Sequence, residues 1–259
     1  MSEVLDGLRV LVTRPAHQSK TLCQLLEQHG ASVFSFPVIE IVEPEDTKTP
    51  RAILSQLESF DFAIFISANS VIRTLEWWGN QPPPPTLAIA AVGQGTARTL
   101  TRLGWPVHIA PKERFDSEAL LALPDFCELT GKKVVIFRGV GGREVLAQTL
   151  VQRGAVVTYA EVYRRAKPSI KNTLLLDWVQ VDRPTVTLLT SNESLQNLVD
   201  LLGPKGRSWL LSTDLVVFSE RTAAFAKKSN LRGKVHVVRQ ASDQGILETL
   251  VSLCSKNNA

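Results

Sequence analysis

Short apolar runs alternate with amphipathic stretches along most of this chain. Runs rich in Val, Ile, Ala and Phe are typical of strands that are buried on both faces of a parallel sheet. Between them, residues such as Leu22, Leu25 and Leu26 recur at helical spacing. The alternation predicts an α/β fold with parallel sheets flanked by helices. The predicted strands include Arg9–Thr13, Ser32–Ile41, Phe62–Ile66, Thr86–Val92, Pro106–Ala110 and Val134–Phe137.

The pattern repeats itself along the chain. Residues 7–41 match residues 131–165 at an offset of 124, so that Arg14 corresponds to Arg138 and Gly30 to Gly154. Later segments match at offsets that drift only from 124 to 128. If the two halves had acquired the same order of strands and helices independently, Arg, Gly, Ser and Thr would not recur at matching positions. We therefore predict two similar domains built from a duplicated unit, with the functional site where the copies meet.

Composition restricts the classes of partner. The net charge of +4 suits an anionic small molecule. The sequence has no Lys/Arg tract interleaved with aromatic residues, so a nucleic acid is the less favoured partner. No apolar run reaches the roughly 18 residues of a membrane span, and the N-terminus has no signal-like pattern. The three cysteines are an odd number at unrelated spacings, which argues against disulfides or zinc and for the cytoplasm.

Polar turns follow several predicted strands, where parallel α/β sheets bind ligands. One pair of turns carries Arg14 in the first copy and the glycine-rich Arg138, Gly139 and Arg143 in the second. Backbone N–H groups of such a turn can approach an anion, and a helix N-terminus favours negative charge. A tight turn with solvated arginines explains the same residues.

Two more pairs of turns start helices. Ser67 and Asn69 correspond to Ser191 and Asn192, and ordinary N-capping accounts for them fully. In the third pair, a Thr hydroxyl beside N–H groups would make a neutral cradle for an anion. This third pair consists of Gly93 with Thr96 and of Ser219 with Thr222.

Few groups suited to acid–base chemistry stand out. Tyr163 is one of only two tyrosines, and Ile39 occupies the corresponding position of the first copy, so the duplication does not require a Tyr there. Its phenol could donate a proton or could simply pack at an interface. His108 and His236 lie in short strands and are expected to be structural. No Ser/His/Asp set, HExxH sequence or carboxylate pair is present.

Seven segments together resemble one enzyme family. They are VLVTRP at 10–15, FISANSV at 65–71, AVGQGTA at 91–97, FRGVGGRE at 137–144, EVYRR at 161–165, LLTSNESL at 188–195 and FSERTA at 218–223. In this order they resemble uroporphyrinogen-III synthase. Each segment is weak alone, whereas the ordered set is specific.

The resemblance implies a domain arrangement that the repeat alone does not. Residues 1–37 with 167–259 would form one domain and residues 41–163 the other. Strands at about 32–41 and 156–165 would link them, with the active cleft between the domains. A monomer is implied, and association with neighbouring enzymes of the pathway stays open.

The resemblance also implies a reaction. Hydroxymethylbilane, a linear tetrapyrrole with eight carboxylates, would lose water and close to uroporphyrinogen III with ring D inverted through a spiro intermediate. Such a lyase of haem biosynthesis needs no metal or cofactor. Tyr163 matches the position proposed to assist the loss of water. Positions lining the cleft match Thr96, Thr222 and the turns at Ser67 and Ser191; the role of Arg221 stays open.

Two other classes of protein are alternatives to this family. A two-lobed binding protein for an anionic metabolite would share the turns and the cleft. A receiver-like regulatory module would need an acidic pair and a phosphoacceptor Asp at strand ends. The strand ends here carry Arg, Ser, Gly and Thr instead.

Overall fold

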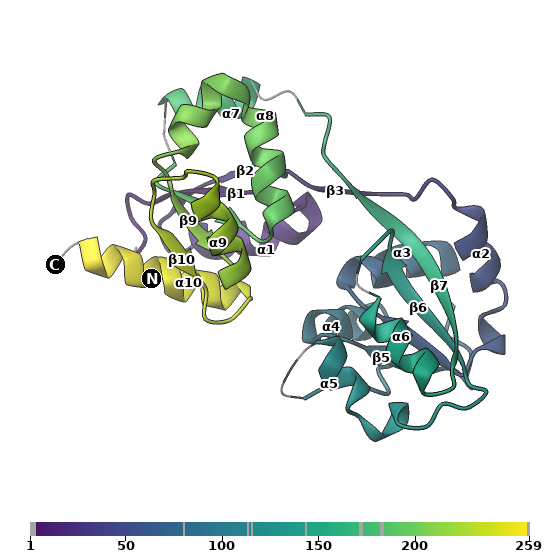
Figure 1. Cartoon of the computed structure of the whole chain (residues 1–259). Coiled ribbons are helices and arrows are strands. Elements are labelled where there is room, and N and C mark those ends of the chain that lie inside the picture. The colour runs from purple at the N-terminus through teal and green to yellow at the C-terminus, as the bar shows by residue number, and fades with distance from the viewer. Residues whose placement is uncertain are drawn as a thin grey trace. The chain divides into compact units, whose positions relative to one another are not determined.

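The chain forms two compact units. The computed structural model describes residues 4–79, 81–112, 114, 116–142, 144–170, 173–181 and 184–257. Unit 1 comprises Met1–Glu40 and Ala166–Ala259, and unit 2 comprises Ile41–Arg165. Each unit has one five-stranded sheet with helices against it (Figure 1). The predicted α/β class with parallel sheets is confirmed.

In unit 1 the strand order is β10-β9-β8-β1-β2. Helices α1 and α10 contact each other and pack Leu22, Leu26 and Leu250 on one core, while α8 contacts α7 and α9. The strands are β1 (Arg9–Val12), β2 (Ser32–Ser35), β8 (Val186–Leu189), β9 (Asp214–Val217) and β10 (Val235–Val237). The helices are α1 (Ala16–Glu27), α7 (Thr173–Val181), α8 (Asn192–Leu210), α9 (Glu220–Lys228) and α10 (Asp243–Asn257).

In unit 2 the strand order is β3-β7-β6-β4-β5. One core packs α3 and α4 through Val71 and Leu100, and the other packs α5 and α6 through Leu120 and Leu150. The strands are β3 (Glu40–Val42), β4 (Phe62–Phe65), β5 (Ala88–Ala91), β6 (Lys133–Gly139) and β7 (Val156–Ala166). The helices are α2 (Lys48–Leu54), α3 (Ala68–Trp78), α4 (Gln94–Arg102), α5 (Ser117–Leu121) and α6 (Val145–Gln152), with 3₁₀ turns at Leu57–Ser59 and Pro124–Phe126.

The two sheets arrange corresponding strands in the same order. By the sequence offset, β6 corresponds to β1, β7 to β2, β4 to β8 and β5 to β9. The order β9-β8-β1-β2 in unit 1 thus matches β5-β4-β6-β7 in unit 2. Each of these matching sets therefore combines strands from both copies of the repeat.

Two predicted strands are wrong in their extent. The segment Ser32–Ile41 is not one strand, because β2 ends at Ser35 and β3 begins at Glu40 in the other sheet. Pro37 lies between them and cannot donate a ladder hydrogen bond. Pro106–Ala110 makes only a single bridge, between Ile109 and Ala90. The proposed linker formed by 32–41 and 156–165 stays a prediction.

The glycine after α1 ends that helix as predicted. Gly30 has φ of +95°, its N–H donates to Glu27 O, and the next N–H, of Ala31, donates to Leu26 O. These two bonds form a Schellman motif, which favours a residue without a side chain. The same pair of bonds ends α6 at Gly154.

Candidate functional site

Unit 2 brings one group of predicted site residues to a single edge of its sheet. Ser67 follows β4, Gly93 follows β5, Arg138 lies at the end of β6, and Tyr163 lies in β7. Strands β7, β6, β4 and β5 are neighbours and run in parallel, so these residues share the carboxyl edge of the sheet.

Tyr163 is joined to Ser67 within this group. The Tyr163 hydroxyl lies 3.1 Å from Ser67 Oγ, and only 3% of Tyr163 is exposed. Ser67 also caps α3, since its Oγ accepts from Ser70 N at 3.1 Å and Ser70 Oγ accepts from Ser67 N. The phenol is therefore a buried group whose hydrogen-bond partner is half-buried at the start of a helix.

The turn after β5 begins a helix without a side-chain cap. Gly93 is the N-cap residue of α4 and, having no side chain, makes no side-chain cap hydrogen bond. Thr96 lies in that turn, and Asn69 lies in the first turn of α3; both are buried. An uncapped helix N-terminus with a neighbouring hydroxyl is a favourable environment for a carboxylate.

Arg138 was predicted to bind substrate, but its guanidinium contacts its own loop. It is 2% exposed, Nε donates to Gly139 O and Gly141 O at 3.2 and 3.1 Å, and Nη1 donates to Glu144 Oε1 at 3.0 Å. Nη2 donates to Gly141 O as well. Arg138 therefore holds the glycine-rich turn together from inside.

Two carboxylates and a tyrosine complete this network, and sequence reasoning missed them. Arg138 Cζ lies 4.5 Å from the centre of the Tyr159 ring, and the Glu161 carboxylate lies 3.8 Å from Arg138 Nε. The Tyr159 hydroxyl donates to Glu144. Burial, and next this bond, raise the pKa of Tyr159 to about 12. The pKa of Glu144 is lowered by the bond from Tyr159 and then by that from Arg138.

Unit 1 brings a second group of predicted residues to the carboxyl edge of its own sheet. Ser191 caps α8 with a reciprocal pair of bonds to Ser194, and Ser219 Oγ accepts from Thr222 N at 3.2 Å at the start of α9. Thr222 Oγ1 lies 3.1 Å from Ser219 Oγ. Asn192 Oδ1 is buried without a hydrogen-bond partner. Both serines are N-caps, which confirms the capping predicted for Ser191.

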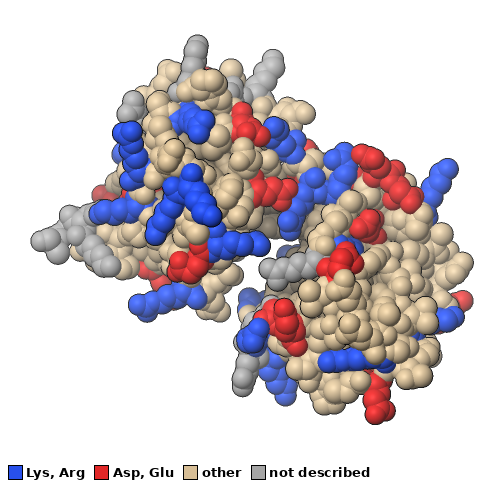
Figure 2. Space-filling model, in the orientation of Figure 1, with Lys and Arg blue, Asp and Glu red and all other residues tan. Residues whose placement is uncertain are grey.

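Arg14 is the buried arginine of this second group. Many Lys and Arg side chains are exposed on the face drawn in Figure 2. Arg14, in contrast, is buried, with only 9% of the residue exposed. Its Nη1 lies 2.5 Å from Asp243 Oδ1, and its Cζ lies 4.8 Å from the centre of the Phe218 ring. Asp243 begins α10, so this ion pair fastens a helix start to the end of β1. The sequence predicts Arg14 as a site residue but neither of its contacts, Asp243 and Phe218.

The other predicted residues are placed as follows. Arg143 lies outside the described residues, and Arg221 is exposed. His108 Nδ1 accepts from Ile89 N at 2.9 Å, which is a structural role. The N–H of Ile89 is thus bound to a side chain and not to a backbone carbonyl of Pro106–Ala110. His236 Nε2 lies 3.7 Å from Asp214 Oδ2.

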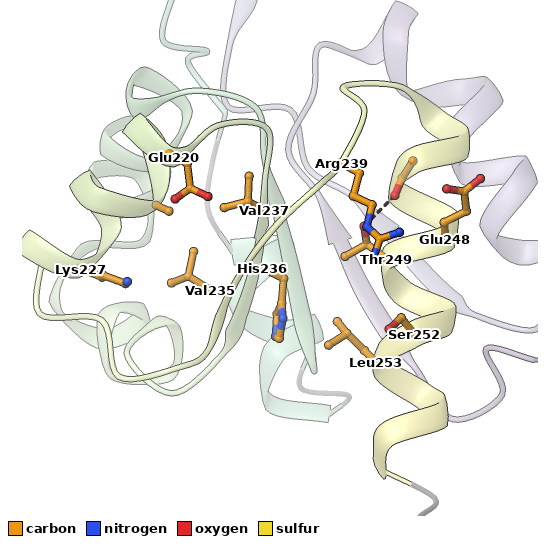
Figure 3. A pocket seen from close by; sticks show the side chains of 12 residues that line it. Glu220, Lys227, Val235, His236, Val237, Arg239, Glu248, Thr249, Ser252 and Leu253 are labelled. Carbon is orange, nitrogen blue, oxygen red and sulfur yellow. Dashed lines mark hydrogen bonds between the residues drawn. The ribbon is translucent and has the colours of Figure 1, made fainter.

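A groove of about 580 Å³ lies along β10 in unit 1. Figure 3 shows Glu220 and Lys227 from α9 on one side and Arg239, Glu248 and Thr249 on the other. None of the predicted site residues lines it. In the described parts of the chain no three His, Cys, Asp or Glu side chains are grouped to hold a metal. Among the described helices, none combines the length and hydropathy of a transmembrane span.

Known sequences resemble this chain over most of its length. A model of the family described as Uroporphyrinogen-III synthase HemD matches residues 20–247. The chain is 34% identical to uroporphyrinogen-III synthase of Salmonella typhimurium over 94% of this chain and 100% of the relative. It is 30% identical to the Escherichia coli enzyme of the same name, again over 94% and 100%.

Solved structures share the fold. A uroporphyrinogen III synthase from the extremely thermophilic bacterium Thermus thermophilus superposes with a TM-score of 0.59 at 15% identity, covering 97% of this chain and 100% of that one. A uroporphyrinogen-III synthetase from Helicobacter pylori gives 0.59 at 16% identity, covering 95% and 99%. At this identity the likeness concerns the fold.

Proposed function

The chain belongs to the uroporphyrinogen-III synthase family, and we propose that it cyclises hydroxymethylbilane to uroporphyrinogen III. In this reaction the terminal hydroxyl leaves as water, and the electrophilic carbon is attacked by the substituted carbon of the last pyrrole. The spiro intermediate then fragments and recloses with ring D inverted. Enzymes of this family are cyclising lyases of tetrapyrrole biosynthesis.

One observation carries the proposal: the carboxyl edges of both sheets present helix starts lined by Ser, Thr and Gly. The substrate closes unaided to the wrong isomer, so the enzyme must chiefly dictate geometry. Hydrogen bonds from backbone N–H groups to carboxylates, each worth about 1.5–3 kcal/mol, can hold a flexible polyanion without any dominant contact. The uncapped start of α4 at Gly93 and Thr96 is the first such cradle.

We assign the assistance of water loss to Tyr163 acting through Ser67. The Tyr163 O–H donates its proton to Ser67 Oγ, while the Ser67 O–H donates to the departing oxygen. The carbon–oxygen bond breaks and water leaves. The overall reaction releases only water, so the proton that the substrate later loses returns to the phenolate.

The two buried arginines have a supporting part in this proposal. Arg14 is occupied by Asp243, and Arg138 by its own turn and Glu144. Both therefore shape the turns whose backbone groups meet the substrate. The shared cleft, action as a monomer, the absence of a cofactor and the cytoplasmic location stay predictions.

Incubation of the purified protein with hydroxymethylbilane tests the proposal. Separation of the oxidised products by chromatography should show type III in place of the type I isomer that forms spontaneously. A matched sample of heat-denatured protein should yield type I. If native protein leaves the isomer ratio unchanged, the chain is a binding protein for an anionic metabolite and not this enzyme.

A further inference from the structure

The side chain of Tyr163 points to an unexpected face of its strand. Side chains alternate between the faces of a sheet. In β7, Val157 and Tyr159 pack with the core beneath α5 and α6, whereas Ala160 and Val162 pack with the core beneath α3 and α4. Simple alternation would place Tyr163 with Tyr159. Instead Tyr163 packs with Ala160 and Val162.

A bulge in β7 causes this change of face. Opposite β6, Phe137 pairs with Ala160 and Arg138 with Glu161, but Gly139 pairs with Tyr163. Val162 is thus the extra residue in the ladder. The pairing resumes at once, because Val140 N donates to Tyr163 O at 2.8 Å. Bulges commonly re-aim a side chain beside an active site.

Gly139 makes room for the re-aimed ring. A Cβ atom at Gly139 would lie 2.7 Å from both Cε2 and Cζ of Tyr163, closer than carbon atoms can approach. Gly139 is not among the glycines with positive φ. Its backbone would therefore accept alanine, and the ring is what excludes it.

Arg138 holds the other side of the bulge. Its guanidinium binds the carbonyls of Gly139 and Gly141 and rests on the ring of Tyr159. Glu161 Oε1 accepts from Gly141 N at 3.1 Å, so β7 grips the same turn. The bulge is fastened from both strands.

The geometry points to this bulge as the device that aims the Tyr163 hydroxyl at Ser67, with Gly139 and Arg138 as positioning residues. This inference rests on the proposed function for the role of Tyr163 in the reaction. The inference gives the glycine-rich turn the role of orienting the proton donor Tyr163, in addition to the binding of an anion.

Gly139→Ala tests the inference kinetically. Displacing the ring should lower kcat about tenfold and leave KM within about twofold, because only the reacting geometry changes. In a Tyr163→Phe background the same substitution should lower kcat no further. Val151→Ala, an exposed position in α6 outside the turn, is the control and should leave kcat unchanged. Independent, multiplying losses in the double variant would overturn the inference.

Tyrosine-ring NMR tests the placement separately from activity. The chain has only two tyrosines, so Tyr159→Phe assigns the ring signals of Tyr163. Gly139→Ala should shift these signals, and Val151→Ala should not. Unchanged Tyr163 signals in Gly139→Ala would overturn the inference. If Tyr163→Phe turns over substrate as fast as the unmodified chain, Tyr163 has no part in the proposed function. The Tyr163 ring signals in Gly139→Ala would still decide whether the bulge orients this ring.

Discussion

Replacing Tyr163 by Phe removes one hydroxyl and leaves the buried ring in place. Since only 3% of Tyr163 is exposed, the packing of the ring is retained. The lost bond to Ser67 should lower the free energy of unfolding by about 1 kcal/mol. Ser67 Oγ keeps its bond from Ser70 N, so no buried acceptor is left unpaired to enlarge that cost. The effect on stability should therefore be small.

The effect on turnover should be larger. If the Tyr163 proton assists the departure of the hydroxyl, formation of the type III isomer should fall at least about tenfold, which corresponds to roughly 1.4 kcal/mol of barrier. Urea unfolding and a coupled assay with freshly formed hydroxymethylbilane measure the two effects on the same preparation.

Tyr159→Phe is the matched control for this experiment. It removes the other phenolic hydroxyl, four residues earlier in the same strand, and keeps the ring on which Arg138 rests. Its turnover should stay within about threefold of the unmodified chain, since its hydroxyl binds Glu144 and not Ser67. Near-normal type III formation by Tyr163→Phe, or equal losses in both variants, would refute the assignment of the proton donor.

Two further predictions concern stability and titration. Gly154→Ala should cost about 2 kcal/mol or more in urea unfolding, because φ is +89° and the new Cβ would lie 2.9 Å from Thr130 Cα. Gly104→Ala, with φ of +84° and open space, should cost only about 1 kcal/mol; equal costs would contradict the steric argument. Tyr159 should titrate near pH 12 by tyrosinate absorbance in a Tyr163→Phe background. Because the ordinary tyrosine pKa is about 10, the stability that Tyr159 contributes should be intact below pH 10 and fall as pH rises from about 10 to 12. A midpoint near 10 would show that neither the burial of Tyr159 nor its contact with Glu144 holds in solution.

Much of the architecture is legible in short-range patterns. Apolar runs and helical periodicity predict the α/β class, and the constant offset predicts two similar domains. Ser67 and Ser191 are N-caps in the structure as expected. Such features depend on hydrogen bonds within a few residues, so the local sequence determines them.

Contacts between distant segments were decided only by the tertiary structure. Arg14 finds Asp243 at a separation of 229 residues, and the sheets exchange strands between the two copies of the repeat. The glycine-rich turn looked like a ligand cradle, yet its arginine is satisfied internally. Local patterns could not show this, because the partners of a buried charge depend on which strands become neighbours.

Tyr163 shows, in a single residue, what the sequence determines and what only the tertiary structure decides. Its place after a repeated strand, with Ile39 as its counterpart, marked it as a candidate from the sequence. Its direction depends on one extra residue, Val162, in the pairing of β7 with β6. Because side chains alternate along a strand, a shift of one residue exchanges the two faces. The register of two strands, and not the composition of either, decides whether this hydroxyl meets Ser67.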